Sequence, residues 1–172
     1  MNEIEPLLER WANFYLLTAA AAATLIGLLF VVITLAAERM PRETPKIRVY
    51  LTPTVVYFAS VLGIAALLTF PNHTRLTATL CICAGGVVGL LYSGSSLIGG
   101  GKKNFDELHD RIAYVIVPFA AYGLLGLGGV LLLHDPKRGL TLVAVGMLSL
   151  LAVAIRNSWA IAIDVVSTPP KA

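Results

Sequence analysis

Charged residues are scarce in this sequence: Asp, Glu, Lys and Arg make up 13% of its 172 residues. A soluble domain carries about 25%. Hydrophobic residues reach 57% and the mean hydropathy is +0.80. This composition excludes a soluble globular domain and a disordered chain. The net charge of +3 lies in short runs between apolar stretches, which argues against nucleic acid as a partner. The remaining class is a polytopic membrane protein, whose first partner is the lipid bilayer.

Five apolar stretches approach the roughly 20 residues that a helix needs to cross a hydrocarbon core of about 30 Å. They cover residues 15–37, 53–70, 76–98, 112–133 and about 140–163. Lipid leaves the edge amides of an open sheet unsatisfied, and no ten-residue alternating pattern indicates a barrel. The sequence therefore predicts an all-α fold, a single membrane domain over residues 1–172 that contains a bundle of five transmembrane helices.

A short amphipathic segment precedes the first span. Ile4, Leu7, Leu8 and Trp11 recur at helical spacing over residues 2–13, which predicts an interfacial helix with Trp11 in the aromatic belt. A partner-docking helix is the alternative. The leader carries three glutamates against one arginine, the wrong sign for a signal peptide, so we expect the first span to be retained.

The distribution of lysine and arginine predicts the orientation. With five spans, the side that holds the N-terminus carries four of these residues: Arg10, Arg75, Lys137 and Arg138. The other side carries eight, or nine with Arg156: Arg39, Arg42, Lys46, Arg48, Lys102, Lys103, Arg111 and Lys171. By the positive-inside rule the N-terminus is outside and the C-terminus is cytoplasmic.

Residue patterns for catalysis, metals and cofactors are weak. Cys81 and Cys83 point about 200° apart on a helix, too divergent for a disulfide. Asp106 and His109 share a helical face but lack the further carboxylates of a di-iron site. The run Gly99–Lys103 departs from the phosphate-loop pattern at Ser96 and Lys103. We therefore expect no catalytic residue, no metal site and no cofactor.

The strongest polar candidate is a cluster of Arg156, Asn157 and Asp164 in the fifth span. Arg156 lies about 24 Å along the helix from residue 140. Its side chain can snorkel to the cytoplasmic interface beside Trp159, and in this interpretation Arg156 has a structural role only. Alternatively, Arg156 and Asn157 form a structural or pore-lining cluster inside the hydrocarbon edge, where a charge requires a partner.

Small residues at four-residue spacing indicate how the helices associate, since they allow close backbone approach within one bundle or between protomers. The candidates are Ala19, Ala23 and Gly27 in the first span, Ala59 and Gly63 in the second, and Gly85 and Gly89 in the third. Pro118 is a candidate kink in the fourth span. Tyr57, Tyr114 and Tyr122 are amphipathic enough to line a cavity.

Four short motifs stand out along the chain: Phe14-Tyr15 with residues 27–31, residues 51–56, Ala113-Tyr114 with Pro118, and residues 155–159. In these motifs the sequence resembles a group of small uncharacterised bacterial five-span integral membrane proteins to which no activity is assigned. The resemblance implies a bacterial inner membrane location and brings no activity with it.

Two functions remain open on the sequence. The first is a non-enzymatic membrane protein that assembles with itself or with a membrane protein partner through its small-residue faces. The second is a small channel or transporter with the polar cluster of Arg156 and Asn157 near its cytoplasmic mouth. The sequence excludes neither.

Overall fold

The computed structural model describes residues 4–39, 45–71, 74–99 and 116–167, and five helices account for nearly all of them. They are α1 (Glu5–Arg39), α2 (Pro45–Thr69), α3 (Arg75–Gly99), α5 (Val117–Leu131) and α6 (Pro136–Ser167). The all-α prediction is confirmed. Four helices, α1, α2, α3 and α6, are long and apolar enough to cross a membrane, and α5 is a shorter apolar helix.

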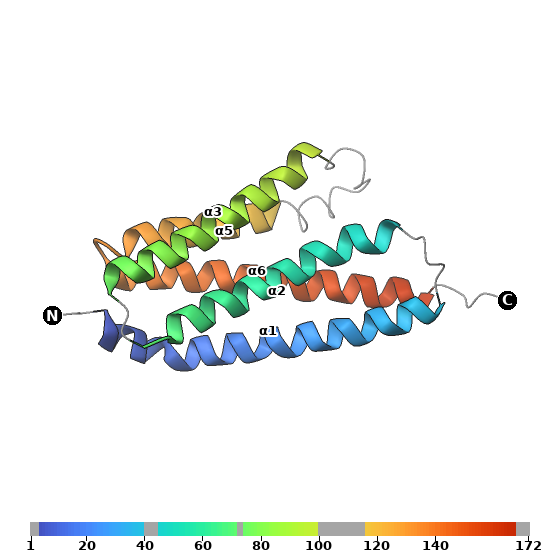
Figure 1. Cartoon of the computed structure of the whole chain (residues 1–172), viewed down its shortest axis with the longest axis horizontal. Helices are drawn as coiled ribbons and strands as arrows, with labels where there is room; N and C mark the ends of the chain where they lie inside the picture. Colours follow the sequence, from blue (N-terminus) through green and yellow to red (C-terminus); the bar gives the residue numbers. More distant parts are fainter. Residues whose placement is uncertain (1–3, 40–44, 72–73, 100–115, 168–172) are drawn as a thin grey trace.

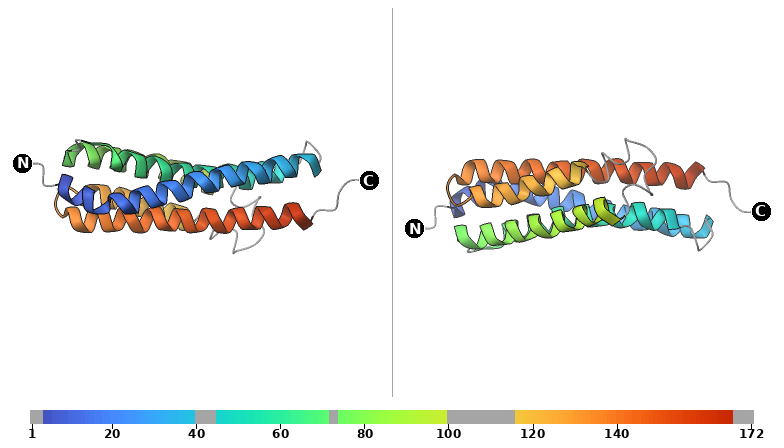
Figure 2. Two further views of the ribbon diagram at one scale, coloured as in Figure 1. Left: turned by 90° about the horizontal axis from the view of Figure 1, so that it is seen from below. Right: turned by 90° about the horizontal axis from the view of Figure 1, so that it is seen from above.

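The helices lie side by side along the long axis of the molecule and alternate in direction, so α1 begins and α6 ends at opposite ends of the bundle (Figure 1). Two views at right angles to the first show α2 and α3 in one layer and α5 and α6 in the other (Figure 2). Helix α6 packs on α5, α2 and α1, whereas α3 packs mainly on α5 and makes a thinner contact with α2. Helix α1 closes the edge next to α2 and α6.

The starts of two helices follow from local capping chemistry. At α3 the Thr77 amide donates to the Thr74 hydroxyl at 3.1 Å, and the Thr74 amide donates to the Thr77 hydroxyl at 2.9 Å. The chain turns after α5, and Asp135 is the last residue before α6. The Arg138 amide donates to the Asp135 carboxylate at 3.2 Å. These side chains satisfy amides that have no partner within the helix, so Thr74 and Asp135 each mark the start of a helix.

The N-terminal segment differs from the predicted separate interfacial helix. Helix α1 runs without a break from Glu5 to Arg39, so the described part of residues 2–13 and the first span form one helix. The rings of Trp11, Phe14 and Tyr15 contact one another across the expected boundary, with centroids 5.5–6.3 Å apart. Ile4 and Tyr15 are both fully buried, because the inner face of this segment packs on the bundle.

The predicted spans differ from the helices mainly at their ends. Helix α3 exceeds the predicted 76–98 by one residue at each end, whereas α2 begins at Pro45 and carries Pro53 in its interior. Helix α6 begins four residues before position 140 and ends four residues after 163. The start of the fourth predicted span, residues 112–115, lies outside the described residues.

Candidate functional site: the cleft between α2 and α3

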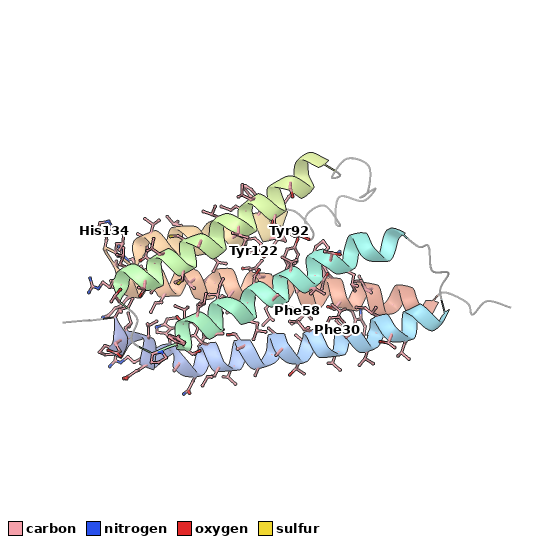
Figure 3. The ribbon with its side chains drawn as sticks, in the orientation of Figure 1. Phe30, Phe58, Tyr92, Tyr122 and His134 are labelled. Atoms are coloured by element: carbon pink, nitrogen blue, oxygen red, sulfur yellow. The ribbon has the colours of Figure 1, made fainter. Side chains whose placement is uncertain are left out.

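A cleft of about 510 Å³ lies between α2 and α3, with α5 beneath it. Its walls are mostly aliphatic and small, and they include Val56 and Gly63 from α2 and Gly85 and Val88 from α3. Three residues that carry hydroxyl groups are also among its lining residues: Ser60, Tyr92 and Tyr122. Figure 3 shows Tyr92 and Tyr122 together in the space between the two helices. The cleft is therefore an apolar groove that runs along the helices and has a small polar centre.

The polar centre has a defined direction of hydrogen bonding. Ser60 Oγ donates to the Val56 carbonyl at 2.8 Å and lies 2.7 Å from the Tyr122 hydroxyl. A serine hydroxyl has one proton, and that proton is used on Val56, so Tyr122 is the donor to Ser60. The Tyr57 ring lies 6.3 Å from the Tyr122 ring at 59° and holds it from the α2 side.

Glycines on α3 make room for Tyr122. A Cβ placed on Gly89 would overlap the Tyr122 ring, and one on Gly86 would lie 2.8 Å from the backbone nitrogen of Gly126. One turn away, the Cys83 thiol donates to the Gly126 carbonyl at 3.7 Å. Helices α3 and α5 consequently approach backbone to backbone, as small residues permit.

The contact between α5 and α6 uses glycine in the same way. A Cβ on Gly128 would lie 2.8 Å from the Gly139 carbonyl oxygen, and one on Gly146 would lie 2.9 Å from the Ala121 carbonyl oxygen. Helix α5 is therefore fixed between α3 and α6. This fixed position holds Tyr122 at the floor of the cleft.

The structure places the predicted small residues in different environments. Gly89 is at the close contact with Tyr122, and Gly85 makes an ordinary contact with Ile64 at 3.8 Å. Ala19 packs partly against the core. The other four are exposed: Ala23, Gly27, Ala59 and Gly63. Gly63 also lines the cleft, and both Gly27 and Gly63 have open space where a Cβ would be.

The structure divides the predicted polar cluster. Asn157 is fully buried and Arg156 is exposed, and Arg156 Nη1 donates to Asn157 Oδ1 at 3.3 Å. Asn157 Nδ2 is buried without a hydrogen-bond partner. Helix α6 includes position 164, but the side chain of Asp164 lies outside the described residues. Trp159 is 69% exposed, so Arg156 and Trp159 both lie at the outer surface of the bundle.

The remaining candidates are distributed over the chain. Cys81 and Cys83 are free and half-buried. Within the described ranges no three His, Cys, Asp or Glu side chains gather as metal ligands do. Asp106 and His109 lie outside those ranges. Pro118 is the second residue of α5, and Ile116 before it already has helical dihedral angles of φ −69° and ψ −51°. The residues before position 116, on which a kink at Pro118 would depend, lie outside the described part.

The chain matches no protein-family model, no curated protein and no solved structure. Its four long apolar helices are consistent with a membrane protein.

Sequence reasoning considered Tyr122 as a cavity-lining residue but missed Ser60 and Tyr92. The available signal was position: Ser60 and Tyr122 lie near the centres of apolar stretches, whereas membrane tyrosines are enriched at the interfaces. Their partnership joins residues 62 positions apart, and no local pattern encodes it.

Proposed function

We propose that this protein is a non-enzymatic, five-span integral membrane protein of the bacterial inner membrane, with its N-terminus outside and its C-terminus cytoplasmic. It acts by associating with a second copy or with another membrane protein through the outer face of α1. Bacterial origin rests on the motif resemblance described above, and the orientation rests on the excess of lysine and arginine on the C-terminal side.

The observation that carries the proposal is the exposure of small residues on α1. Only 17% of the apolar stretch of α1 is buried in the bundle, compared with 50% of the apolar stretch of α6. Ala20, Ala23, Thr24 and Gly27 follow one another at helical spacing and all are exposed. A partner helix can approach such a row closely and gain dispersion contacts that flexible lipid chains provide less well. The flat row therefore suits a helix better than lipid.

The experiment compares wild type with Gly27→Leu by native mass spectrometry in nanodiscs. Gly27 has open space around it, so the added side chain leaves the fold intact but blocks close approach. Gly94→Leu on α3, which also has open space, is the matched control. We expect an oligomer in wild type and in the control, and a monomer in Gly27→Leu. An oligomer that persists in Gly27→Leu would refute association through this face.

A small channel or transporter is the second candidate, and the buried Asn157 favours it. Its unpartnered amide nitrogen lies in the bundle next to Arg156, where a polar solute or ion would find a hydrogen-bond donor. Solute flux into liposomes, measured for wild type and Arg156→Ala, tests this candidate. It predicts flux in wild type that falls in the variant, and a wild type without flux would exclude it.

A further inference from the structure

The cleft between α2 and α3 offers a hydrogen-bond acceptor to an apolar ligand. Ser60 Oγ uses its proton on the Val56 carbonyl and one lone pair on Tyr122, so one lone pair is left. Tyr122 is fully buried beneath, whereas Ser60 is half-buried and lines the cleft. A ligand that reaches this point therefore meets an oxygen that can accept a hydrogen bond, and it gains most if it carries a hydrogen-bond donor.

We propose that this cleft binds one long-chain alcohol dissolved in the bilayer, with its hydrocarbon chain along the cleft and its hydroxyl donating to Ser60 Oγ. The site differs from the α1 face through which the protein is proposed to associate. The two proposals can therefore fail separately.

The size of the cleft suits a single chain. From Cys81 to Tyr92 the α3 wall extends about 16 Å. The cleft holds about 510 Å³, and its walls carry small residues, Gly63, Ala84 and Gly85, which leave room for a slim chain between α2 and α3.

The depth of the hydroxyls favours a ligand from the bilayer. Ser60 lies nine residues before the end of α2 and Tyr122 nine before the end of α5, so each is about 13 Å from the same end of the bundle. This places both near the middle of a hydrocarbon core of about 30 Å. A molecule that reaches them from the side must already be dissolved in lipid.

The first experiment locates the ligand. Purified protein in phosphatidylcholine nanodiscs is irradiated with a hexadecanol probe that carries a diazirine in its chain, and labelled peptides are identified by mass spectrometry. We expect labels on α2 and α3 residues that line the cleft. Gly63→Leu fills the cleft at a position with open space and should remove most labelling, whereas Gly27→Leu on α1 should leave it unchanged.

The second experiment tests the hydrogen bond with the methyl ether of the same probe, which has no donor. Wild type should be labelled about threefold to tenfold more by the alcohol than by the ether, the range for one neutral hydrogen bond. Ser60→Ala and Tyr122→Phe both break the Ser60–Tyr122 hydrogen bond, but only Ser60→Ala removes the acceptor oxygen. The preference should disappear in Ser60→Ala and persist in Tyr122→Phe.

Three results would overturn the inference. Equal labelling by alcohol and ether in wild type would mean that the cleft takes hydrocarbon chains without recognising a hydroxyl. Undiminished labelling in Gly63→Leu would place the probe elsewhere. Crosslinks from the cleft to a second copy would make it a protein interface. Oligomer mass, measured on the same samples, reports separately on association through α1.

Discussion

The Tyr122 hydroxyl on α5 lies 2.7 Å from Ser60 Oγ on α2, and the Tyr122 ring lies against Gly89 on α3. One side chain thus connects three helices at a point where α2 and α3 are separated by a cleft. The contact between α2 and α3 is otherwise thin, so the position of α3 relative to α2 depends on this tyrosine and on the glycine that accommodates it.

Gly89→Ala should lower the stability of the bundle. The new methyl group would overlap the Tyr122 ring, which cannot retreat without losing Ser60, and overpacking of this kind costs about 1–3 kcal/mol. Unfolding of the purified protein by denaturant in detergent micelles measures the change. Gly94→Ala on the same helix has open space and should unfold like wild type. Equal stability of the two variants would contradict the close contact at Gly89.

Asp135→Ala should destabilise the start of α6 more than Arg138→Ala does. The Asp135 carboxylate accepts the Arg138 amide at 3.2 Å, and loss of such a cap costs about 1 kcal/mol. The ion pair between Arg138 Nε and Asp135 at 3.3 Å has an arginine side chain that is 83% exposed. Solvent screening leaves such a pair a small contribution.

Salt separates the two contributions of Asp135 to stability, the hydrogen bond from the Arg138 amide and the ion pair with the Arg138 side chain. The loss of stability in Arg138→Ala should shrink towards zero in 1 M NaCl, because salt screens the ion pair. Most of the loss in Asp135→Ala should remain, since the amide hydrogen bond is local. Denaturant unfolding at low and high salt measures both, and equal losses in the two variants would argue against capping by Asp135.

Asn157→Leu should leave the bundle as stable as wild type or make it more stable. Asn157 is fully buried and its Nδ2 has no partner, and an unsatisfied buried donor costs about 1–3 kcal/mol. Ser158→Ala is the control, since the Ser158 hydroxyl is already satisfied by the Ala154 carbonyl of its own helix. A marked loss of stability in Asn157→Leu would show that the hydrogen bond from Arg156, or a partner of Nδ2 in the membrane such as a bound solute, outweighs the cost of the unsatisfied donor.

Cysteine labelling tests the orientation. In a background with Cys81→Ala and Cys83→Ala, a membrane-impermeant maleimide applied to intact cells should label a His134→Cys variant at the turn between α5 and α6. It should label a Ser167→Cys variant only after the cells are opened, because α6 ends on the proposed cytoplasmic side. The reverse pattern would invert the topology and contradict the prediction from lysine and arginine.

Hydropathy predicted the helices well and their packing poorly, for one physical reason. Lipid and protein interior are both apolar, so the sequence of α3 indicates a span but not which face meets lipid. Gly85 and Gly89 share the spacing of Ala23 and Gly27, yet the first pair contacts protein and the second faces outward. The cleft depends on how far α2 and α3 diverge, and Tyr122 on a third helix contacts both of them there. The continuity of α1 was missed because an acidic leader with Trp11 is also typical of an interfacial helix.

Helices α1 and α6 contact each other and have 35 and 32 residues, about 52 and 48 Å of helix. A hydrocarbon core of about 30 Å covers less than two thirds of either length. Residues 11–37 of α1 carry no charge and correspond to about 40 Å of helix, so α1 can tilt or slide when the bilayer becomes thicker or thinner without moving a charge into lipid. In α6 the charge-free residues 139–155 correspond to only about 26 Å, so Arg156 limits the same movement. The tilt of α1 would then report the thickness of the membrane around it.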